Sequence, residues 1–290
     1  MFSKNTLITS LLAVALCSVS ACSTTQTQDA QNQAVSQQKQ AVPPMPQMPV
    51  VPSLEEMAQK EIDSNRQYVE SQIVKKDGKT KYFFDKDGKL VQKKAAGGYY
   101  RLVLGTTAAG NCAVQDFFAD SNTKQSEPLI VAKKDCNNLT AGANDGVVIT
   151  YDKKQQVDGV VHFKNGKVLN NASRDDNGIV LYADLADEPK NTIIEKVDSH
   201  GAMNTYVFNN NEIQEFTFFA SDKTTPEVDF PTVTRLHYVN GTLNPANSYV
   251  YGNDANLSFD KLDQKTIDKF SKNANGRILH MKKILQVLKK

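Results

Sequence analysis

The sequence predicts an all-β fold, mainly an antiparallel meander of hairpins, with a short N-terminal helix and C-terminal helices. From about residue 69 onward, short runs rich in Val, Ile, Thr, Tyr and Phe alternate with turn residues. Asp-Gly or Asn-Gly pairs stand between several of these runs, and both residues of such a pair tolerate the positive φ of a tight hairpin turn. About a dozen strands joined in this way favour an antiparallel sheet architecture.

The N-terminal helix is predicted over residues 54–68. The stretch Ser53-Leu54-Glu55-Glu56 has the pattern of a capping box, in which the Ser53 hydroxyl and the Glu56 carboxylate each accept a backbone N–H. The helix offers only a thin apolar stripe, made of Leu54, Met57 and Ile62. We therefore expect it to lie on a sheet, and a helix that binds a partner is the alternative.

The strands are predicted from apolar runs and from the turns between them. In residues 99–104 the pattern alternates and places Tyr100, Leu102 and Leu104 on one face. The other predicted strands are 72–75, 80–84, 90–91, 113–118, 129–132, 146–151, 160–163, 178–182, 192–194, 205–208, 213–219 and 232–239. The hairpin turns are expected at Asp77-Gly78, Asp87-Gly88, Asn165-Gly166, Asn209-Asn210-Asn211 and Asn240-Gly241.

The C-terminal region returns to helical spacing. Leu262, Ile267 and Phe270 keep this spacing, and Asn275-Gly276 is expected to break the helix. Residues 277–288 resume it with an apolar arc of Ile278, Met281, Ile284, Leu285 and Leu288. From Lys272 onward this region is basic and has no acid. We expect it to pack on the domain, and the alternative is a basic amphipathic helix on an anionic membrane surface or an acidic partner.

The first 22 residues have the pattern of a secretory signal. Lys4 precedes an apolar run over residues 7–16, which is too short to span a bilayer, and small residues then precede Cys22. The sequence Val19-Ser20-Ala21-Cys22 resembles the lipobox of bacterial lipoproteins. This resemblance implies cleavage after Ala21, attachment of fatty acyl chains such as palmitate at Cys22, and a mature protein held to a membrane by its lipidated N-terminus.

Ser23 follows Cys22 where inner-membrane lipoproteins typically carry Asp, so the same resemblance implies the outer membrane. Residues 23–53 are rich in Gln, Ser, Thr, Ala and Pro and bury too little apolar surface to fold. The predicted organisation is therefore a signal peptide over 1–21, a lipidated disordered tether over 22–53, a β-rich domain over 54–258 and a basic helical C-terminus over 259–290.

The cysteines suggest an oxidising compartment. Cys17 lies in the signal and Cys22 is the lipid site, so only Cys112 and Cys136 remain in the mature domain. We expect an exported protein to join such a pair as a disulfide. A metal or redox pair is the competing interpretation, but there is no CxxC motif, no nearby His and no third ligand.

Two stretches share an "aromatic, two or three polar residues, Gly-Lys-aliphatic" unit, over residues 79–90 and 161–168. This unit resembles the MORN-like hairpin repeats of bacterial antitoxin-component proteins. The spacing between units is irregular, whereas a true repeat keeps a fixed period. The resemblance implies a meander of hairpins and carries no activity across.

No motif that would run a reaction is found. There is no G-x-S-x-G, no H-E-x-x-H and no phosphate-binding Gly-rich loop. His162 and His237 fall within strand patterns and are expected to be half-buried sheet residues. Asp85 and Asp87 lack the remaining ligands of a calcium loop and are expected to serve a hairpin turn.

The sequence therefore predicts no enzyme, no metal and no cofactor. The net charge of +2 provides no strong field for nucleic acid. The predicted function is that of a non-enzymatic binding or structural module in the cell envelope, with a possible protein partner there and contact loops over 138–145, 221–229 and 243–256. The alternatives are an immunity-type or inhibitor lipoprotein that neutralises a toxin or lytic enzyme, and an envelope enzyme whose catalytic residues come from distant positions.

Overall fold

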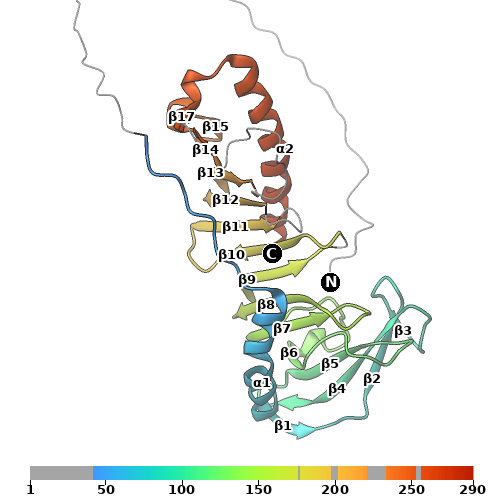
Figure 1. The fold of residues 1–290 in the computed structure, drawn as a ribbon. Helices are drawn as coiled ribbons and strands as arrows, with labels where there is room; N and C mark the ends of the chain where they lie inside the picture. Colours follow the sequence, from blue (N-terminus) through green and yellow to red (C-terminus); the bar gives the residue numbers. More distant parts are fainter. Residues whose placement is uncertain (1–41, 176, 197–201, 221–232, 253–255, 290) are drawn as a thin grey trace, which may run out of the picture. The chain divides into compact units, whose positions relative to one another are not determined.

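The computed structural model describes residues 42–175, 177–196, 202–220, 233–252 and 256–289. These residues form antiparallel strands in two sheets, with one helix near the N-terminus and one at the C-terminus (Figure 1). The predicted all-β fold class is thus confirmed. The predicted signal, Cys22 and most of the predicted tether lie outside the described residues.

The first sheet has the order β3-β2-β4-β5-β6, with β1 also paired to β4. Its strands are β1 (Ile73–Lys76), β2 (Lys81–Phe84), β3 (Leu90–Val91), β4 (Tyr99–Thr107), β5 (Cys112–Phe118) and β6 (Leu129–Val131). The Asp87-Gly88 turn joins β2 to β3, as predicted, and Gly88 has the positive φ that this turn needs.

The hairpin predicted at Asp77-Gly78 is wrong. Strands β1 and β2 do not pair with each other, because both lie antiparallel to β4, one after the other. The Asp77 carboxylate accepts the backbone N–H groups of Lys79 and Thr80, and the N–H groups of Asp77 and Gly78 donate to carbonyls of β4. Asp-Gly therefore makes an irregularity between two strands that follow one another along β4, with Gly78 at φ +80°.

The second sheet has the order β17-β16-β14-β13-β12-β11-β10-β9-β8-β7, with β15 paired to β14. Its strands are β7 (Gly146–Tyr151), β8 (Val157–Lys164), β9 (Lys167–Arg174), β10 (Val180–Asp184), β11 (Lys190–Lys196), β12 (Met203–Asn209), β13 (Glu212–Phe219), β14 (Val233–Val239), β15 (Thr242–Leu243), β16 (Tyr249–Tyr251) and β17 (Asn256–Ser258). The hairpins predicted at Asn165-Gly166, Asn209–Asn211 and Asn240-Gly241 are confirmed. Strand β9 was not among the predicted strands.

Helix α1 (Leu54–Gln72) begins with the predicted capping box. The Glu56 N–H donates to the Ser53 hydroxyl, and the Ser53 N–H donates to the Glu56 carboxylate at 2.8 Å. The helix continues four residues beyond the predicted end. It lies on β7 and β8, where Leu54 and Ala58 share a buried cluster with Ile149. The expectation that this helix lies on a sheet is confirmed.

Helix α2 (Gln264–Leu288) is one continuous helix, so the predicted break at Asn275-Gly276 and the plural C-terminal helices are wrong. Its buried residues join the large core of the second sheet and are Ala274, Ile278, Met281, Leu285 and Leu288.

The two helices cover opposite faces of this sheet. Tyr182 packs in the α1 cluster and is paired with Ile194, so these two side chains share one face. Ile193 comes directly before Ile194 in the strand, so its side chain lies on the other face, where it packs in the α2 cluster.

Residues 42–53 lead into α1 (blue in Figure 1) and form an extended segment with a three-residue period of burial. Pro43, Pro46 and Pro49 are partly buried, whereas Pro44, Gln47 and Val50 are exposed. A polyproline II helix has three residues per turn, so these two sets occupy different sides of it. Near its end the Pro52 carbonyl accepts a hydrogen bond from Tyr182 of β10 at 2.6 Å. We call residues 43–52 the proline segment.

Candidate binding site

Residues 119–145 link β5 of the first sheet to β7 of the second, and we call them the connecting segment. The segment contains only β6 and the 3-10 helix η1 (Lys133–Asp135) as regular elements. Most of the segment lacks the regular hydrogen bonds of a helix or a sheet, so its backbone N–H and C=O groups need other hydrogen-bond partners. Three groups of interactions hold it in place.

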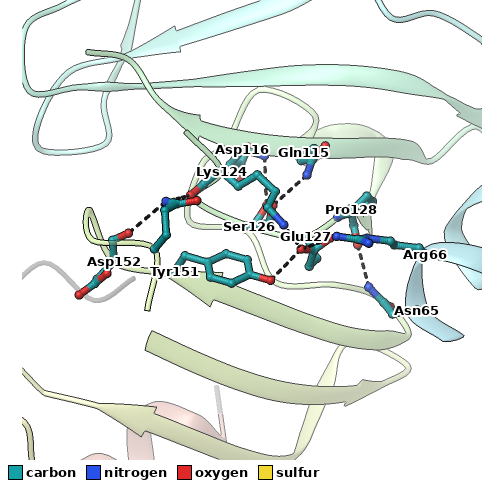
Figure 2. Close-up of polar contacts among 11 residues, drawn as sticks. Asn65, Arg66, Gln115, Asp116, Lys124, Ser126, Glu127, Pro128, Tyr151 and Asp152 are labelled. Carbon is teal, nitrogen blue, oxygen red and sulfur yellow. Dashed lines mark hydrogen bonds and ion pairs between the residues drawn. The ribbon is translucent and has the colours of Figure 1, made fainter. Parts of the chain in front are cut away.

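The first group is centred on Glu127, whose side chain is 0% exposed (Figure 2). Its carboxylate accepts hydrogen bonds from Arg66 of α1 at 2.7 and 2.9 Å, from the ammonium of Lys124, and from the hydroxyl of Tyr151 of β7 at 2.7 Å. Its backbone N–H donates to the carbonyl of Ile149 at 2.9 Å. One carboxylate thus joins the connecting segment to a helix and to the second sheet.

The environment of Glu127 determines its ionisation. Burial opposes the charged form, but the hydrogen bonds from Arg66, Lys124 and Tyr151 outweigh this effect and hold the pKa of Glu127 below its usual range. Burial, together with the hydrogen bond to Glu127, raises the pKa of Tyr151 above its usual range. The carboxylate is therefore ionised at neutral pH and the phenol is neutral. Because both carboxylate oxygens are occupied, this arrangement suits a structural joint better than a general base.

Asn65 of α1 and Ser126 extend this group. The Asn65 amide donates to the carbonyl of Pro128 at 2.9 Å, and its oxygen accepts the N–H of Val147. The Ser126 hydroxyl accepts the N–H of Asp116 at 3.1 Å, so the segment is also bonded to β5 (Figure 2).

The second group is the buried ion pair of Arg101 on β4 and Asp116 on β5. The guanidinium makes two parallel hydrogen bonds to the carboxylate, at 2.7 and 2.8 Å, and is fully buried. Its remaining nitrogen donates to the carbonyl of Asn138 at 2.7 Å and to that of Asp135 at 3.3 Å. A charged side chain of the sheet thus satisfies the backbone of the connecting segment.

The third group is the disulfide between Cys112 and Cys136, which confirms the predicted pairing. It links the first residue of β5 to the residue after η1, with the two Cα atoms 5.7 Å apart. On the chain-entropy model a loop of this length stabilises the fold by roughly 3–4 kcal/mol.

A half-open cavity of about 340 Å³ borders the connecting segment. The end of α1, the start of β1, the β4–β5 turn and residues 144–145 line it. Most of the side chains there are polar or small, and the lining residues are Tyr68, Ser71, Gln72, Val74, Thr107, Ala108, Ala109, Asn111, Ile130, Asn144 and Asp145. The Asp145 carboxylate accepts a hydrogen bond from the backbone N–H of Asn165 and forms an ion pair with Lys164. These interactions, above all the hydrogen bond from Asn165, hold the pKa of Asp145 below its usual range.

The structure separates the three predicted contact loops. Residues 138–145 end at this cavity, whereas 221–229 lie outside the described residues. Within 243–256, residues Tyr249–Tyr251 form β16, and Tyr251 is fully buried. That part of the prediction is wrong, because the alternating aromatic residues of this stretch pack on a sheet.

The predicted histidines lie in strands. His162 of β8 and His237 of β14 are half-buried, as expected, and His162 faces Glu61 of α1 at 3.4 Å. Among the residues that the structure describes, no three His, Cys, Asp or Glu side chains gather as they would around a metal ion. No helix in the described part of the chain has the length and apolar character needed to cross a membrane.

Sequence reasoning missed Glu127, Arg66, Tyr151 and Arg101. Only Arg101 offered a signal, as a single charge within an apolar strand pattern, whereas Arg66 and Glu127 stand next to polar residues. Arg101 shares the face of Tyr99 and Val103 in a strand pattern, and such a position predicts a buried partner. Comparison with known proteins adds no relative, since no protein family, curated protein or solved structure matches this chain.

Proposed function

We propose that this chain is a lipid-anchored lipoprotein of the bacterial outer membrane that acts as a non-enzymatic binding module. Two observations support the proposal. The lipobox-like Val19-Ser20-Ala21-Cys22 motif follows a short apolar run, and Cys112 and Cys136 form the disulfide that an exported protein retains. The residues best placed for chemistry, above all Glu127, are engaged in holding the fold together.

The binding surface in this proposal is the cavity together with residues 138–145. The observation that carries it is the threefold fixation of the connecting segment by Glu127, by Arg101 and by the disulfide. An irregular segment fixed by buried ion pairs loses little conformational entropy when it binds a partner. The partner we propose is a protein of the cell envelope.

The anchor is tested by the Cys22→Ala variant. We expect the variant to be either unprocessed, with its N-terminal signal retained, or soluble, whereas the wild-type chain is processed and fractionates with the outer membrane. Unchanged fractionation of the variant would contradict lipid anchoring. Protease treatment of intact cells, with a tag after Lys290, then reports whether the domain faces the outside.

The binding surface is tested by a photo-crosslinking amino acid at exposed Thr140, with exposed Lys190 of β11 as the control position. We expect one envelope protein to crosslink from Thr140 and not from Lys190. The Ala109→Trp substitution, which fills the cavity from the β4–β5 turn, should abolish this crosslink. Absence of a product at Thr140, or the same product at both positions, would contradict the proposed surface.

A further inference from the structure

Helix α2 carries more positively charged side chains than those that form ion pairs with the sheet beneath it. Within Gln264–Lys289 there are seven Lys or Arg residues and one acid, Asp268. Three of these cations pair with carboxylates of the second sheet or of its β10–β11 turn, in the pairs Arg277–Glu195 at 3.4 Å, Lys282–Glu212 at 2.8 Å and Lys289–Glu188 at 3.2 Å. These pairs help to hold the helix on the sheet, and they account for fewer than half of its cations.

The four remaining lysines share the solvent side of α2. Lys265, Lys269, Lys272 and Lys283 are exposed, and none of them forms an ion pair with any residue that the structure describes. Their spacing of four, three and eleven residues keeps them within a broad stripe along the helix. Asp263, the N-cap residue of α2, accepts the N–H of Thr266, and Asp268, the one acid within the helix, accepts a hydrogen bond from Gln264 at 2.8 Å.

Two large apolar side chains lie among these lysines. Leu279 is 57% exposed and Val287 is 38% exposed, and neither belongs to the apolar side of the helix that packs in the core. We call these six residues (Lys265, Lys269, Lys272, Leu279, Lys283 and Val287) the outer ridge. At 1.5 Å per residue the ridge extends for about 33 Å along one continuous helix.

We propose that the outer ridge of α2 docks on an anionic phospholipid surface. The six side chains share one side of a continuous helix, so the lysines can act together on the headgroups while Leu279 and Val287 enter the interface. Each lysine near an anionic leaflet contributes to binding, and salt screens this contribution. This inference rests on the proposed function, because a lipid anchor would hold the domain near such a surface.

Vesicle sedimentation tests the proposal, with the full chain carrying Cys22→Ser so that no lipid is attached. Vesicles of phosphatidylethanolamine with phosphatidylglycerol provide the anionic surface. Vesicles of phosphatidylcholine alone measure the contribution of the apolar N-terminus. We expect binding to the anionic vesicles to exceed binding to phosphatidylcholine, and to weaken when NaCl is raised from about 0.15 to 0.5 M.

Replacement of the four ridge lysines, as K265Q/K269Q/K272Q/K283Q, should weaken anionic-vesicle binding by at least about 100-fold, since each lysine contributes about fivefold. The matched control replaces four exposed lysines in β1 and in the turns around β2 and β3, as K75Q/K79Q/K89Q/K93Q, and removes the same charge. The control should change binding by less than about threefold. Circular dichroism verifies that both variants are folded.

An equal loss in both variants would overturn the proposal, because net charge and not the ridge would then drive binding. Absence of anionic-vesicle binding by the parent chain would also overturn it and would leave an acidic protein as the occupant of the ridge. Neither outcome bears on the anchor, because the Cys22→Ala fractionation experiment measures lipid attachment separately.

Discussion

The hydroxyl of Tyr151 donates a hydrogen bond of 2.7 Å to the carboxylate of Glu127 and thereby joins the connecting segment to the first strand of the second sheet. The same carboxylate accepts hydrogen bonds from Arg66 of α1, so three parts of the chain meet at one buried anion. Removal of the anion would leave its donors without an acceptor. Removing one partner of a buried, hydrogen-bonded charge destabilises a protein strongly, because the remaining partners stay buried without a hydrogen bond.

Glu127→Gln should lower the free energy of unfolding by about 2–3 kcal/mol. The amide keeps the shape of the carboxylate, but it has no negative charge and only one acceptor oxygen for Arg66, Lys124 and Tyr151. The expected loss of unfolding free energy is smaller than for a fully buried ion pair, because the side chains of Arg66 and Lys124 are 47% and 36% exposed. Urea unfolding followed by circular dichroism measures it.

The matched control is Glu55→Gln, which removes a carboxylate from the other end of α1. Glu55 pairs with Arg174 at 2.9 Å but is half-exposed. Its loss should cost less than about 1 kcal/mol, as is usual for surface ion pairs. Equal losses in the two variants would show that Glu127 is no more than a surface charge in energetic terms.

The stabilisation by Glu127 should depend on pH. The pKa of Glu127 is lower in the folded protein than its ordinary value, so the folded state binds this proton less well than the unfolded state. The stabilisation is present above the unfolded-state pKa of about 4.3 and is lost as the pH falls through the lower folded-state pKa. The difference in unfolding free energy between wild type and Glu127→Gln should therefore shrink from pH 6 to pH 3. A constant difference across this range would contradict an ionic role for Glu127.

The features that local chemistry determines could be predicted from the sequence. The capping box at Ser53 and Glu56 needs only residues three apart. The turns at Asn165-Gly166 and Asn240-Gly241 need only two residues that accept positive φ. The disulfide followed from the number of cysteines left after the predicted signal and lipid site are set aside.

The features that depend on distant residues could not be predicted. Asp77-Gly78 has the same local signal as the true hairpins, but pairing of both flanking strands with β4 prevents them from pairing with each other. Glu127 finds its partners 61 residues earlier and 24 residues later in the chain. Nothing in the sequence near Glu127 identifies those partners, so the centre of the candidate site was missed.

Gly276 shows how tertiary packing can outweigh helix propensity. Glycine in a helix interior costs up to about 1 kcal/mol relative to alanine, which is why a break was predicted there. The buried residues on both sides, Ala274 and Ile278, pack on the second sheet and hold the helix through this point. A Cβ atom at Gly276 would have no neighbour within 4 Å.

Gly276→Ala should therefore raise the free energy of unfolding by about 0.5–1 kcal/mol. The gain comes from the unfolded chain, which loses conformational freedom, while the folded helix accepts the methyl group without contact. Gly105→Ala is the contrasting variant, because a Cβ there would lie 2.5 Å from the carbonyl of Lys75 and 2.6 Å from the side chain of Ile73. It should destabilise the protein. Thermal unfolding measures both, and a lower melting temperature for Gly276→Ala would contradict the continuous helix.

The proline segment should contribute to stability through one side only. Pro46 is partly buried and Pro44 is exposed, although both are prolines within the same extended stretch. Replacing either by alanine frees the unfolded chain and costs about 0.5–1 kcal/mol. Pro46→Ala also loses buried apolar surface, so it should cost about 0.5–1 kcal/mol more than Pro44→Ala. Urea unfolding of the two variants measures this difference. Equal losses would mean that residues 43–52 do not pack on the domain. A larger loss in Pro46→Ala would mean that the folded part begins before α1. It would then include residues that composition alone predicts to be a disordered tether.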